Sequence, residues 1–536
     1  MKLVFVGADH EVTGSCHYLE VAGKHILVDY GMEQGVNVFE NVPLPVAESM
    51  IDYVFLTHAH VDHSGLLPLL YARGFRGQIY TTDATADLCS IMLRDCAHIQ
   101  SAEAEWKNRK AKRSANNAVV EPLYTMEDAD GVIRRFVPCH YNTIVEVCEG
   151  VKIRFTDIGH LLGSASIEVW LTEDGNTKKI VFSGDIGNKS KPLIRDPQYI
   201  SEADYVVMES TYGDRFHKHS AEHIEEFARV IQETLDRGGN VVIPAFAVGR
   251  TQEVLYYIRR IKEEGLVTGH GDFEVYVDSP LAVEATQVFK NNMLDCYNDE
   301  TKALVKKGVN PISFKGLKLS VSSEDSVAIN FDAKPKVIIS AAGMCDAGRI
   351  RHHLKHNLWR PECTILFAGY QAVGTLGRSI IEGKKEVKLF GETIDVEAHI
   401  EKIEGISGHA DQDGLIRFIT SFMDKPRQVF VVHGDDDVCD SFAGKLSKEY
   451  GISAFAPFSG MVYNLAEEKF EVITKGIPIR REDEKDASKR AGGVFARLLA
   501  AADRLRRVVM HNEGGANKDL AKFADQINSL CDKWDR

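Results

Sequence analysis

A cluster of three histidines and one aspartate directly follows a short apolar stretch of the sequence. The run THAHVDH occupies residues 57–63, and residues 53–56 before it are Tyr, Val, Phe and Leu. Burying such side chains without partners costs stability, because each ring carries two polar nitrogens and the carboxylate carries a charge. A bound metal removes this cost, and surface histidines without a metal are the less favoured alternative. Since neighbouring loop residues point in different directions, His58 and His60 can bind one ion while Asp62 and His63 bind a second.

The length and composition are those of a multidomain globular protein. At 536 residues the chain is longer than one hydrophobic core usually organises, so we expect two or three domains. No stretch approaches the roughly 20 apolar residues of a membrane span, and Gly7 and Asp9 interrupt the N-terminus too early for a signal peptide. We therefore expect a cytoplasmic protein without a membrane segment. Its ten cysteines contain no C-x-x-C pair, which favours reduced thiols.

The net charge of −14 argues against a uniformly basic surface for nucleic acid, but it leaves room for a local one. A run of basic residues lies on a predicted helix and consists of Lys107, Arg109, Lys110, Lys112 and Arg113. Such a run can bind a phosphate backbone whatever the total charge of the protein. A solvated helix face is the favoured interpretation of this run taken alone.

Short predicted strands in residues 1–210 repeatedly end at an ionisable residue. Functional sites of α/β proteins lie beyond the carboxyl ends of their strands, so we expect these residues to share one cleft. In chain order they are Asp29, the histidine cluster, Asp157, His160, Asp185 and Glu209.

Residues 211–395 show a different pattern, in which strand, turn and helix alternate regularly. This alternation predicts a parallel sheet in an inserted domain. Small residues in the turns lead into helix N-termini, where exposed N–H groups can bind phosphate. Glycines needed only for tight turns are an equally good interpretation of each turn by itself. The candidate phosphate contacts in these turns are Arg250, Ser340, Gly343 and Arg378.

After residue 395 the chain returns to strands that end at candidate ligands. His409 follows the predicted strand 400–406, and His433 follows the strand 428–432. We infer that the chain re-enters its first domain here. The last segment, from about residue 476, is charged and helical in pattern, which suggests a packing or dimerisation element. Its apolar face consists of Val494, Leu498, Leu499, Ala502, Leu505, Val508 and Val509.

The order of these residues resembles the signature of the metallo-β-lactamase superfamily. The matching positions are Asp29, the 58–63 cluster, His160, Asp185 and His433. Glu209, His409 and His433, spaced around a large α/β insertion, also resemble the three β-CASP motifs of the nucleic-acid-processing branch. Residues 7–16 are similar to the start of prokaryotic RNA-processing members, and the resemblance covers residues 1 to about 475.

The resemblance implies an α/β fold, in which a metallo-β-lactamase αββα sandwich is interrupted by a β-CASP domain with a parallel sheet flanked by helices. The implied boundaries are 1–210 and 396–475 for the sandwich, 211–395 for the β-CASP domain and 476–536 for a helical extension. The active site would lie in the cleft between the sandwich and the inserted domain. Any homodimer would form through the β-CASP or C-terminal regions.

The resemblance also assigns a ligand set for two metal ions. His58, His60 and His160 would hold one zinc, and Asp62, His63 and His433 would hold the other, with Asp185 bridging both. Imidazole and carboxylate suit Zn²⁺, and Mn²⁺ is an alternative. Asp29 would act from outside the ligand set, by accepting a hydrogen bond from a metal-bound ring.

The implied chemistry is hydrolysis of RNA phosphodiester bonds by a metal-activated hydroxide. His409 is the candidate general acid, with Glu209 holding it protonated, and a purely structural histidine is the alternative. Histidine at this motif is associated with RNA-processing members and valine with DNA-specific ones. We therefore expect a zinc-dependent ribonuclease of RNA processing or decay that cuts internally, with 5′-to-3′ exonuclease activity as a further option.

Three other functions are less favoured. A small-molecule hydrolase acting on a thioester or lactam would not need so large an insertion. A DNA nuclease is disfavoured by the histidine at position 409. A non-catalytic scaffold is disfavoured because every metal ligand of the family is present.

Overall fold

The computed structural model describes residues 1–35, 38–113, 120–217, 223–372, 374–479 and 517–534, and the single positions Ala502, Leu505, Val508 and Val509. The chain forms two compact units, Met1–Ile477 and Pro478–Arg536. Every predicted site residue belongs to the first unit. No helix of the described residues is long and apolar enough to cross a membrane.

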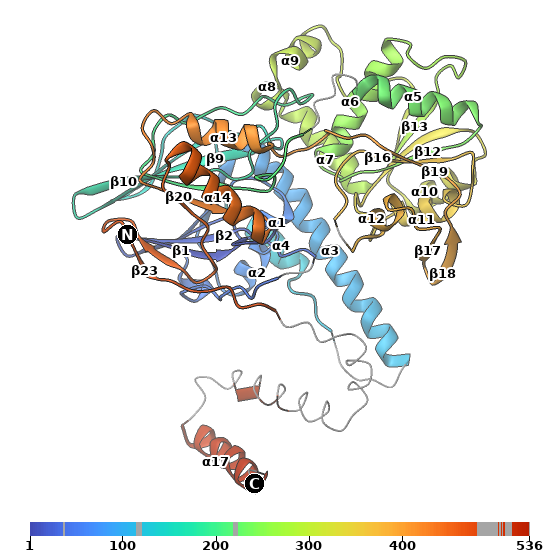
Figure 1. Cartoon of the computed structure of the whole chain (residues 1–536). Helices are drawn as coiled ribbons and strands as arrows, with labels where there is room; N and C mark the ends of the chain where they lie inside the picture. The colour runs from blue at the N-terminus through green and yellow to red at the C-terminus, as the bar shows by residue number, and fades with distance from the viewer. Residues whose placement is uncertain are drawn as a thin grey trace. The chain divides into compact units, whose positions relative to one another are not determined.

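Two mixed β-sheets form the centre of the metallo-β-lactamase-like part (Figure 1). The first has the order β23 (Lys469–Val472), β22 (Val462–Asn464), β1 (Lys2–Gly7), β2 (Cys16–Val21), β3 (Lys24–Val28), β4 (Tyr53–Phe55), β5 (Gln78–Thr82) and β6 (Phe136–Cys139). The second has the order β21 (Ala454–Phe455), β20 (Gln428–Val432), β11 (Tyr205–Glu209), β10 (Asn176–Phe182), β9 (Ala165–Glu173), β8 (Val151–Asp157) and β7 (Val145–Cys148).

Alternate strand residues point to opposite faces, so each sheet has apolar side chains on its outer face as well as its inner face. Helices cover the outer face of each sheet. Leu19, Phe155 and Ile167 belong to the core that the two sheets share. The outer face of the first sheet packs against α2 (Leu67–Ala72), α3 (Asp83–Arg113) and α4 (Met126–Ile133). The outer face of the second sheet packs against α13 (Gln412–Thr420) and α14 (Asp436–Tyr450). These layers confirm the predicted αββα sandwich.

The inserted domain contains a six-stranded sheet whose strand pairs are all parallel. Its order is β14 (Leu317–Ser320), β13 (Glu274–Asp278), β15 (Lys336–Ser340), β12 (Val241–Pro244), β16 (Thr364–Phe367) and β19 (His399–Lys402). Val241 and Ile243 pack in one core with α5 (His223–Asp236), α6 (Arg250–Glu263) and α7 (Pro280–Asn291). Val242 packs in another with α10 (Ser323–Phe331), α11 (Ile350–Asn357) and α12 (Leu376–Ile381). The predicted parallel sheet between two helical layers is therefore present.

Smaller elements complete the first unit. They are η1 (Glu48–Met50), α1 (Val61–Ser64), α8 (Met293–Cys296), α9 (Asp299–Lys306) and the hairpin of β17 (Glu386–Leu389) with β18 (Glu392–Asp395). The second unit contains α17 (Asn517–Trp534).

The strand after residue 395 lies in the parallel sheet, not in the sandwich. β19 pairs with β16, with His399 opposite Thr364 and Lys402 opposite Phe367. Its polar residues suit an edge strand, which presents one side to solvent. The chain reaches the sandwich only in the loop that follows, where Asn188 N donates to Gly408 O at 3.1 Å and Ala410 N donates to Ile186 O at 2.7 Å.

Part of the predicted apolar C-terminal face lies outside the described residues, namely Val494, Leu498 and Leu499. Val508 and Val509 are 40% and 43% exposed. In the predicted basic run, the side chains of Lys110, Lys112 and Arg113 also lie outside the description. Lys107 forms an exposed ion pair with Glu103 at 3.8 Å.

Candidate metal centre and active site

Strand ends of both sheets bring the predicted ligands together at one edge of the sandwich. Asp29 follows β3, the histidine cluster follows β4, and His160 lies in the loop after β8. Asp185 follows β10 and His433 follows β20. The ligand atoms of His58, His60, His160 and Asp185 lie within 4.8 Å of one another, as do those of Asp62, His63 and His433. Residues 370 positions apart in sequence, such as His63 and His433, therefore lie in one site.

The first group is centred on three ring nitrogens. His58 Nε2 lies 3.1 Å from His60 Nδ1, and His160 Nε2 lies 3.2 Å from the same atom. Asp185 Oδ2 lies 3.4 Å from Nε2 of both His58 and His160.

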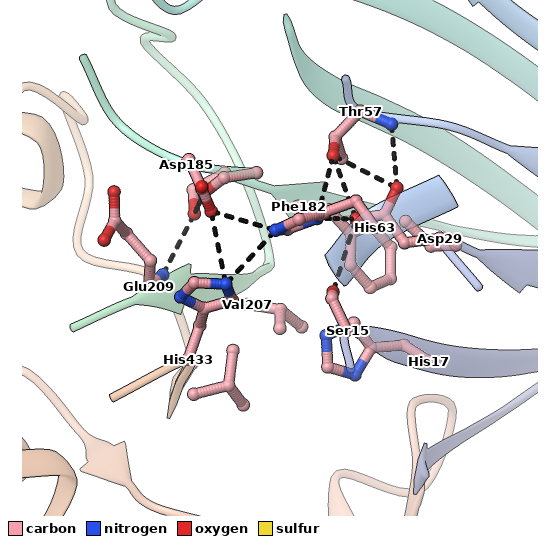
Figure 2. A pocket seen from close by; sticks show the side chains of 14 residues that line it. Ser15, His17, Asp29, Thr57, His63, Phe182, Asp185, Val207, Glu209 and His433 are labelled. Atoms are coloured by element: carbon pink, nitrogen blue, oxygen red, sulfur yellow. Dashed lines mark hydrogen bonds and ion pairs between the residues drawn. The ribbon is translucent and has the colours of Figure 1, made fainter. Parts of the chain in front are cut away.

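The second group uses the other oxygen of the same aspartate. His63 Nε2 and His433 Nε2 lie 3.1 Å apart, and Asp185 Oδ1 lies 3.2 Å from the first and 3.6 Å from the second. Asp62 Oδ2 lies 3.7 Å from His433 Nε2. Figure 2 shows Asp185 joined by dashed lines to both His433 and His63 in this pocket. The two oxygens of Asp185 thus face different ligand groups.

The chemistry of these side chains fits bound metal ions. Burial lowers the pKa of His58 and His160 well below its usual value, so both rings are held in the neutral form that binds metal. Close nitrogen pairs in a buried site need a shared partner, because neutral rings cannot all donate to one another. Among the described residues, His160 Nδ1 has no hydrogen-bond partner, and Asp185 Oδ1 has ion-pair contacts with His63 and His433 but no hydrogen bond of good geometry. The donor set is the nitrogen and oxygen set that zinc prefers.

Residues outside the ligand set fix the orientation of the rings. Asp29 Oδ2 lies 2.6 Å from His63 Nδ1, so the Nε2 of His63 is turned toward His433. Thr57 donates to Asp29 through its backbone N at 2.8 Å and through Oγ1 at 2.9 Å, as Figure 2 shows. Such partners of metal-binding histidines set the tautomer and the direction of the ring.

Two threonines lie beside the second ring nitrogen of ligand histidines, and the sequence analysis does not single them out. Thr57 Oγ1 also lies 3.1 Å from His58 Nδ1, and Thr211 Oγ1 lies 3.2 Å from His433 Nδ1. Thr57 directly precedes the histidine cluster, and Thr211 follows Glu209 by two residues. Their closeness to ligand motifs was the only sequence signal for this role.

His409 and Glu209 form a pair beside the ligand groups. His409 Nδ1 lies 3.1 Å from Glu209 Oε2, and its Nε2 lies 3.9 Å from Asp185 Oδ2. Burial disfavours the charged ring, but the carboxylates of Glu209 and Asp185 outweigh this effect and raise the pKa of His409 to about 9. Glu209 is itself fixed, because Ile186 N donates to its Oε1. The structure therefore favours a protonated His409 whose Nε2 points toward the ligand groups.

The four candidate phosphate contacts have different surroundings. Arg250 is ion-paired with Glu253 at 2.5 Å and donates to Ile406 O at 2.9 Å. Ser340 is buried and donates to Asp278 O at 2.8 Å. Both side chains are therefore already engaged inside the protein.

Of the other two candidates, Gly343 is buried and Arg378 lies nearer the surface. Arg378 is partly exposed and pairs with Glu382 at 2.7 Å. A Cβ on Gly343 would lie 3.1 Å from Phe246 N, so a larger residue at this position would press on the turn after β12. Asp157 is not part of the ligand groups, because it pairs with Arg195 at 2.7 Å.

A buried lysine near the site carries no motif and was missed. Lys191 Nζ donates to the backbone oxygen of His160 at 2.7 Å and pairs with Glu253 Oε1 at 3.2 Å. Its side chain is only 10% exposed. Lys191 thus links the loop of a predicted metal ligand to helix α6 of the inserted domain.

Comparison with known proteins identifies the family. Three family models match the chain. The model described as "Metallo-beta-lactamase superfamily" matches residues 11–85, and the model described as "Beta-Casp domain" matches residues 251–380. The model described as "Zn-dependent metallo-hydrolase RNA specificity domain" matches residues 393–457. Ribonuclease TTHA0252 of Thermus thermophilus is 35% identical over 440 residues, which cover 82% of this chain and 94% of that protein. The chain belongs to the β-CASP family of the metallo-β-lactamase superfamily.

Further β-CASP relatives have related names. An RNase J-like protein of Methanocaldococcus jannaschii is 32% identical over 463 residues, covering 86% of this chain and 99% of the relative. Transcription termination factor FttA of Methanosarcina mazei is 30% identical over 469 residues, covering 85% of this chain and 70% of the relative. The predicted family resemblance is confirmed.

Proposed function

We propose that this β-CASP protein is a zinc-dependent ribonuclease that hydrolyses RNA phosphodiester bonds. The observation that carries the proposal is the position of Asp185, whose two oxygens face two groups of ligand-type side chains. The match to an RNA specificity domain over residues 393–457, which contain His409 and His433, supports RNA as the substrate. The similarity to ribonuclease TTHA0252 along most of both chains supports the same reaction.

We assign each metal to one ligand group. His58, His60 and His160 would hold the first zinc and Asp62, His63 and His433 the second, with Asp185 between them. Two such cations would supply the Lewis acidity that activates water and stabilises the charge of the scissile phosphate. Asp29 keeps the Nε2 of His63 free for its ion, because it accepts from Nδ1.

His409 is assigned the role of general acid. Its Nδ1 faces Glu209, so the proton that can be transferred resides on Nε2, which faces the ligand groups. This proton would pass to the oxygen that leaves when the P–O bond breaks. Glu209 would hold the ring in the charged state and in this orientation, because its two carboxylate oxygens lie 3.2 and 3.1 Å from Nδ1.

Cleavage of circular and of 5′-labelled linear RNA by zinc-loaded protein tests the proposal. Internal cutting opens the circle, whereas a purely 5′-to-3′ exonuclease leaves it intact. We expect the circle to be opened. Turnover of thioester or lactam substrates without any RNA cleavage would reject the ribonuclease assignment.

The metal content is measured separately. We expect about two zinc ions per chain by elemental analysis of freshly purified protein. Manganese in place of zinc would change the identity of the metal but not the ligand assignment.

A further inference from the structure

Two aromatic side chains on the inserted domain are unusually exposed near the active site. Phe246 and Tyr370 are each 50% exposed. Phe246 lies in the turn after β12, and Tyr370 lies in the turn after β16. Because β12 and β16 are neighbouring parallel strands, both turns emerge at the same edge of the sheet.

Contacts through the neighbouring residues place the two turns side by side. Gln371 Nε2, next to Tyr370, donates to Gly343 O at 2.9 Å. A Cβ on Gly343 would lie 3.2 Å from Cδ2 of the Phe246 ring. The two aromatic residues therefore sit on one continuous rim.

This rim borders the loops that hold the catalytic side chains. A Cβ on Gly249, in the turn of Phe246, would lie 3.0 Å from Leu161, the neighbour of His160. Arg250 donates to Ile406 O, in the segment that leads to His409. The exposed rings thus lie on the β-CASP side of the catalytic centre.

Cations accompany the rings. Tyr370 lies within electrostatic reach of Arg215 and of Arg378, whose guanidinium groups pair with Asp214 at 2.6 Å and with Glu382 at 2.7 Å. Arg215 lies over the ring of Tyr212 at 5.5 Å, and that ring meets His409 edge-on at 6.0 Å. Arginine side chains and exposed aromatic surface therefore occur together on the side of the general acid.

We propose that Phe246 and Tyr370 form a stacking site for the unpaired bases of single-stranded RNA on either side of the scissile phosphate. Single-stranded nucleic acid is bound in this way, with bases stacked on aromatic rings and the backbone held by cations. Bases within a duplex are already stacked and paired, so the site selects single strands. This inference rests on the proposed ribonuclease function and defines its substrate more closely.

Paired variants test the role of each ring. Phe246→Ala and Tyr370→Ala remove the stacking surface, whereas Phe246→Tyr and Tyr370→Phe keep it. The matched control is Phe331→Ala, because Phe331 is 73% exposed but ends α10, which leads to the opposite, amino edge of the parallel sheet. All variants are compared at equal zinc content.

The substrate is a short single-stranded RNA of known cleavage position, together with versions that lack one base beside this position. We expect each alanine variant to lose about 5- to 100-fold in kcat/KM on intact RNA, on the scale of one lost base stack. Removing the base that stacks on the substituted ring should then leave the kcat/KM of that alanine variant unchanged. The same removal should lower the kcat/KM of the wild type by a similar factor. Ring-retaining variants should keep the dependence on the neighbouring base, and Phe331→Ala should behave like the wild type.

A binding measurement separates this inference from the ribonuclease assignment. The fluorescence of 2-aminopurine in the RNA should be quenched on binding by the wild type and less quenched by the alanine variants. Cleavage with the same base dependence in all variants overturns the stacking site and leaves the ribonuclease intact. RNA that is bound with ring-dependent quenching but never cleaved rejects the ribonuclease and supports the stacking site, and absence of both binding and cleavage overturns both.

Discussion

The buried ion pair between Lys191 and Glu253 allows a quantitative prediction about how the two parts of the enzyme are joined. The side chains of Lys191, Glu253 and Arg250 are 10%, 8% and 13% exposed. Burial disfavours the charged carboxylate of Glu253, but the two cations outweigh it and lower its pKa. Glu253→Gln removes this negative charge with almost no change in shape, and it leaves two neighbouring buried cations without a counter-charge.

The expected loss of stability follows from burial. Removing one partner of a buried ion pair typically costs about 3–5 kcal/mol, because the remaining charge is desolvated and unpaired. The end of the same helix offers a matched control, since Arg260 pairs at 2.7 Å with Glu264, the residue that caps α6, and these side chains are 36% and 43% exposed. Exposed pairs contribute about 0–1 kcal/mol, so Glu264→Gln should have little effect.

The measurement is urea denaturation of both variants and the wild type, followed by circular dichroism. A double variant, Glu253→Gln with Lys191→Met, should recover part of the loss, because it also removes one uncompensated cation. A Glu253→Gln protein that loses no more free energy of unfolding than Glu264→Gln would refute the argument. So would a double variant that is less stable than Glu253→Gln alone.

Three further variants test the catalytic centre and the inserted domain. Asp185→Asn should lose metal and activity together, and a variant that kept two metals and the full rate would contradict the bridging position. His409→Ala should keep its zinc but cleave RNA about 100-fold more slowly or worse, and loss of zinc would instead make His409 a ligand. Asp278→Asn should destabilise the protein at neutral pH. Burial raises the pKa of Asp278, but hydrogen bonds from His353, Ser326, Ser320 and Arg349 outweigh burial and hold it well below its usual value. The stability that this group contributes is fully present above its unfolded pKa of about 3.9 and is lost as the pH falls. Thermal melts should therefore show the gap between wild type and Asp278→Asn narrowing below about pH 5, and a gap that stays constant to pH 3 would be evidence against this role.

Much of the fold could be predicted from local sequence, because each strand is marked by its own short run of apolar residues. Residues 26–28, 180–182 and 428–432 read as strands from their apolar branched residues, and all three lie in strands of the sandwich. The ligand positions could be predicted because they directly follow these strands. Which imidazoles share an ion came from the family resemblance, since sequence spacing alone does not bring position 433 next to position 63.

Features that depend on tertiary partners were harder to predict. The sequence pattern places the predicted strand 400–406 in the sandwich, because the chain reads as strand again after residue 395. The observed strand β19 (His399–Lys402) instead pairs with β16 in the parallel sheet. Arg250 was expected to face phosphate, yet Glu253 one helical turn later pairs with it. Lys191 lies in a loop without a motif, and only the folded structure shows that its ammonium reaches His160 and Glu253.

The inserted domain leaves and re-enters the sandwich at neighbouring positions. β11 ends at Glu209, and the returning loop brings His409 Nδ1 to 3.1 Å from Glu209 Oε2. The chain then forms β20, the parallel partner of β11. The second sheet therefore continues from β11 to β20 although the inserted domain separates these strands in sequence. The entropic cost of closing so long a connection grows only slowly with its length. Lengthening or shortening the β-CASP segment would change what covers the catalytic edge while leaving the backbone that carries the metal ligands intact.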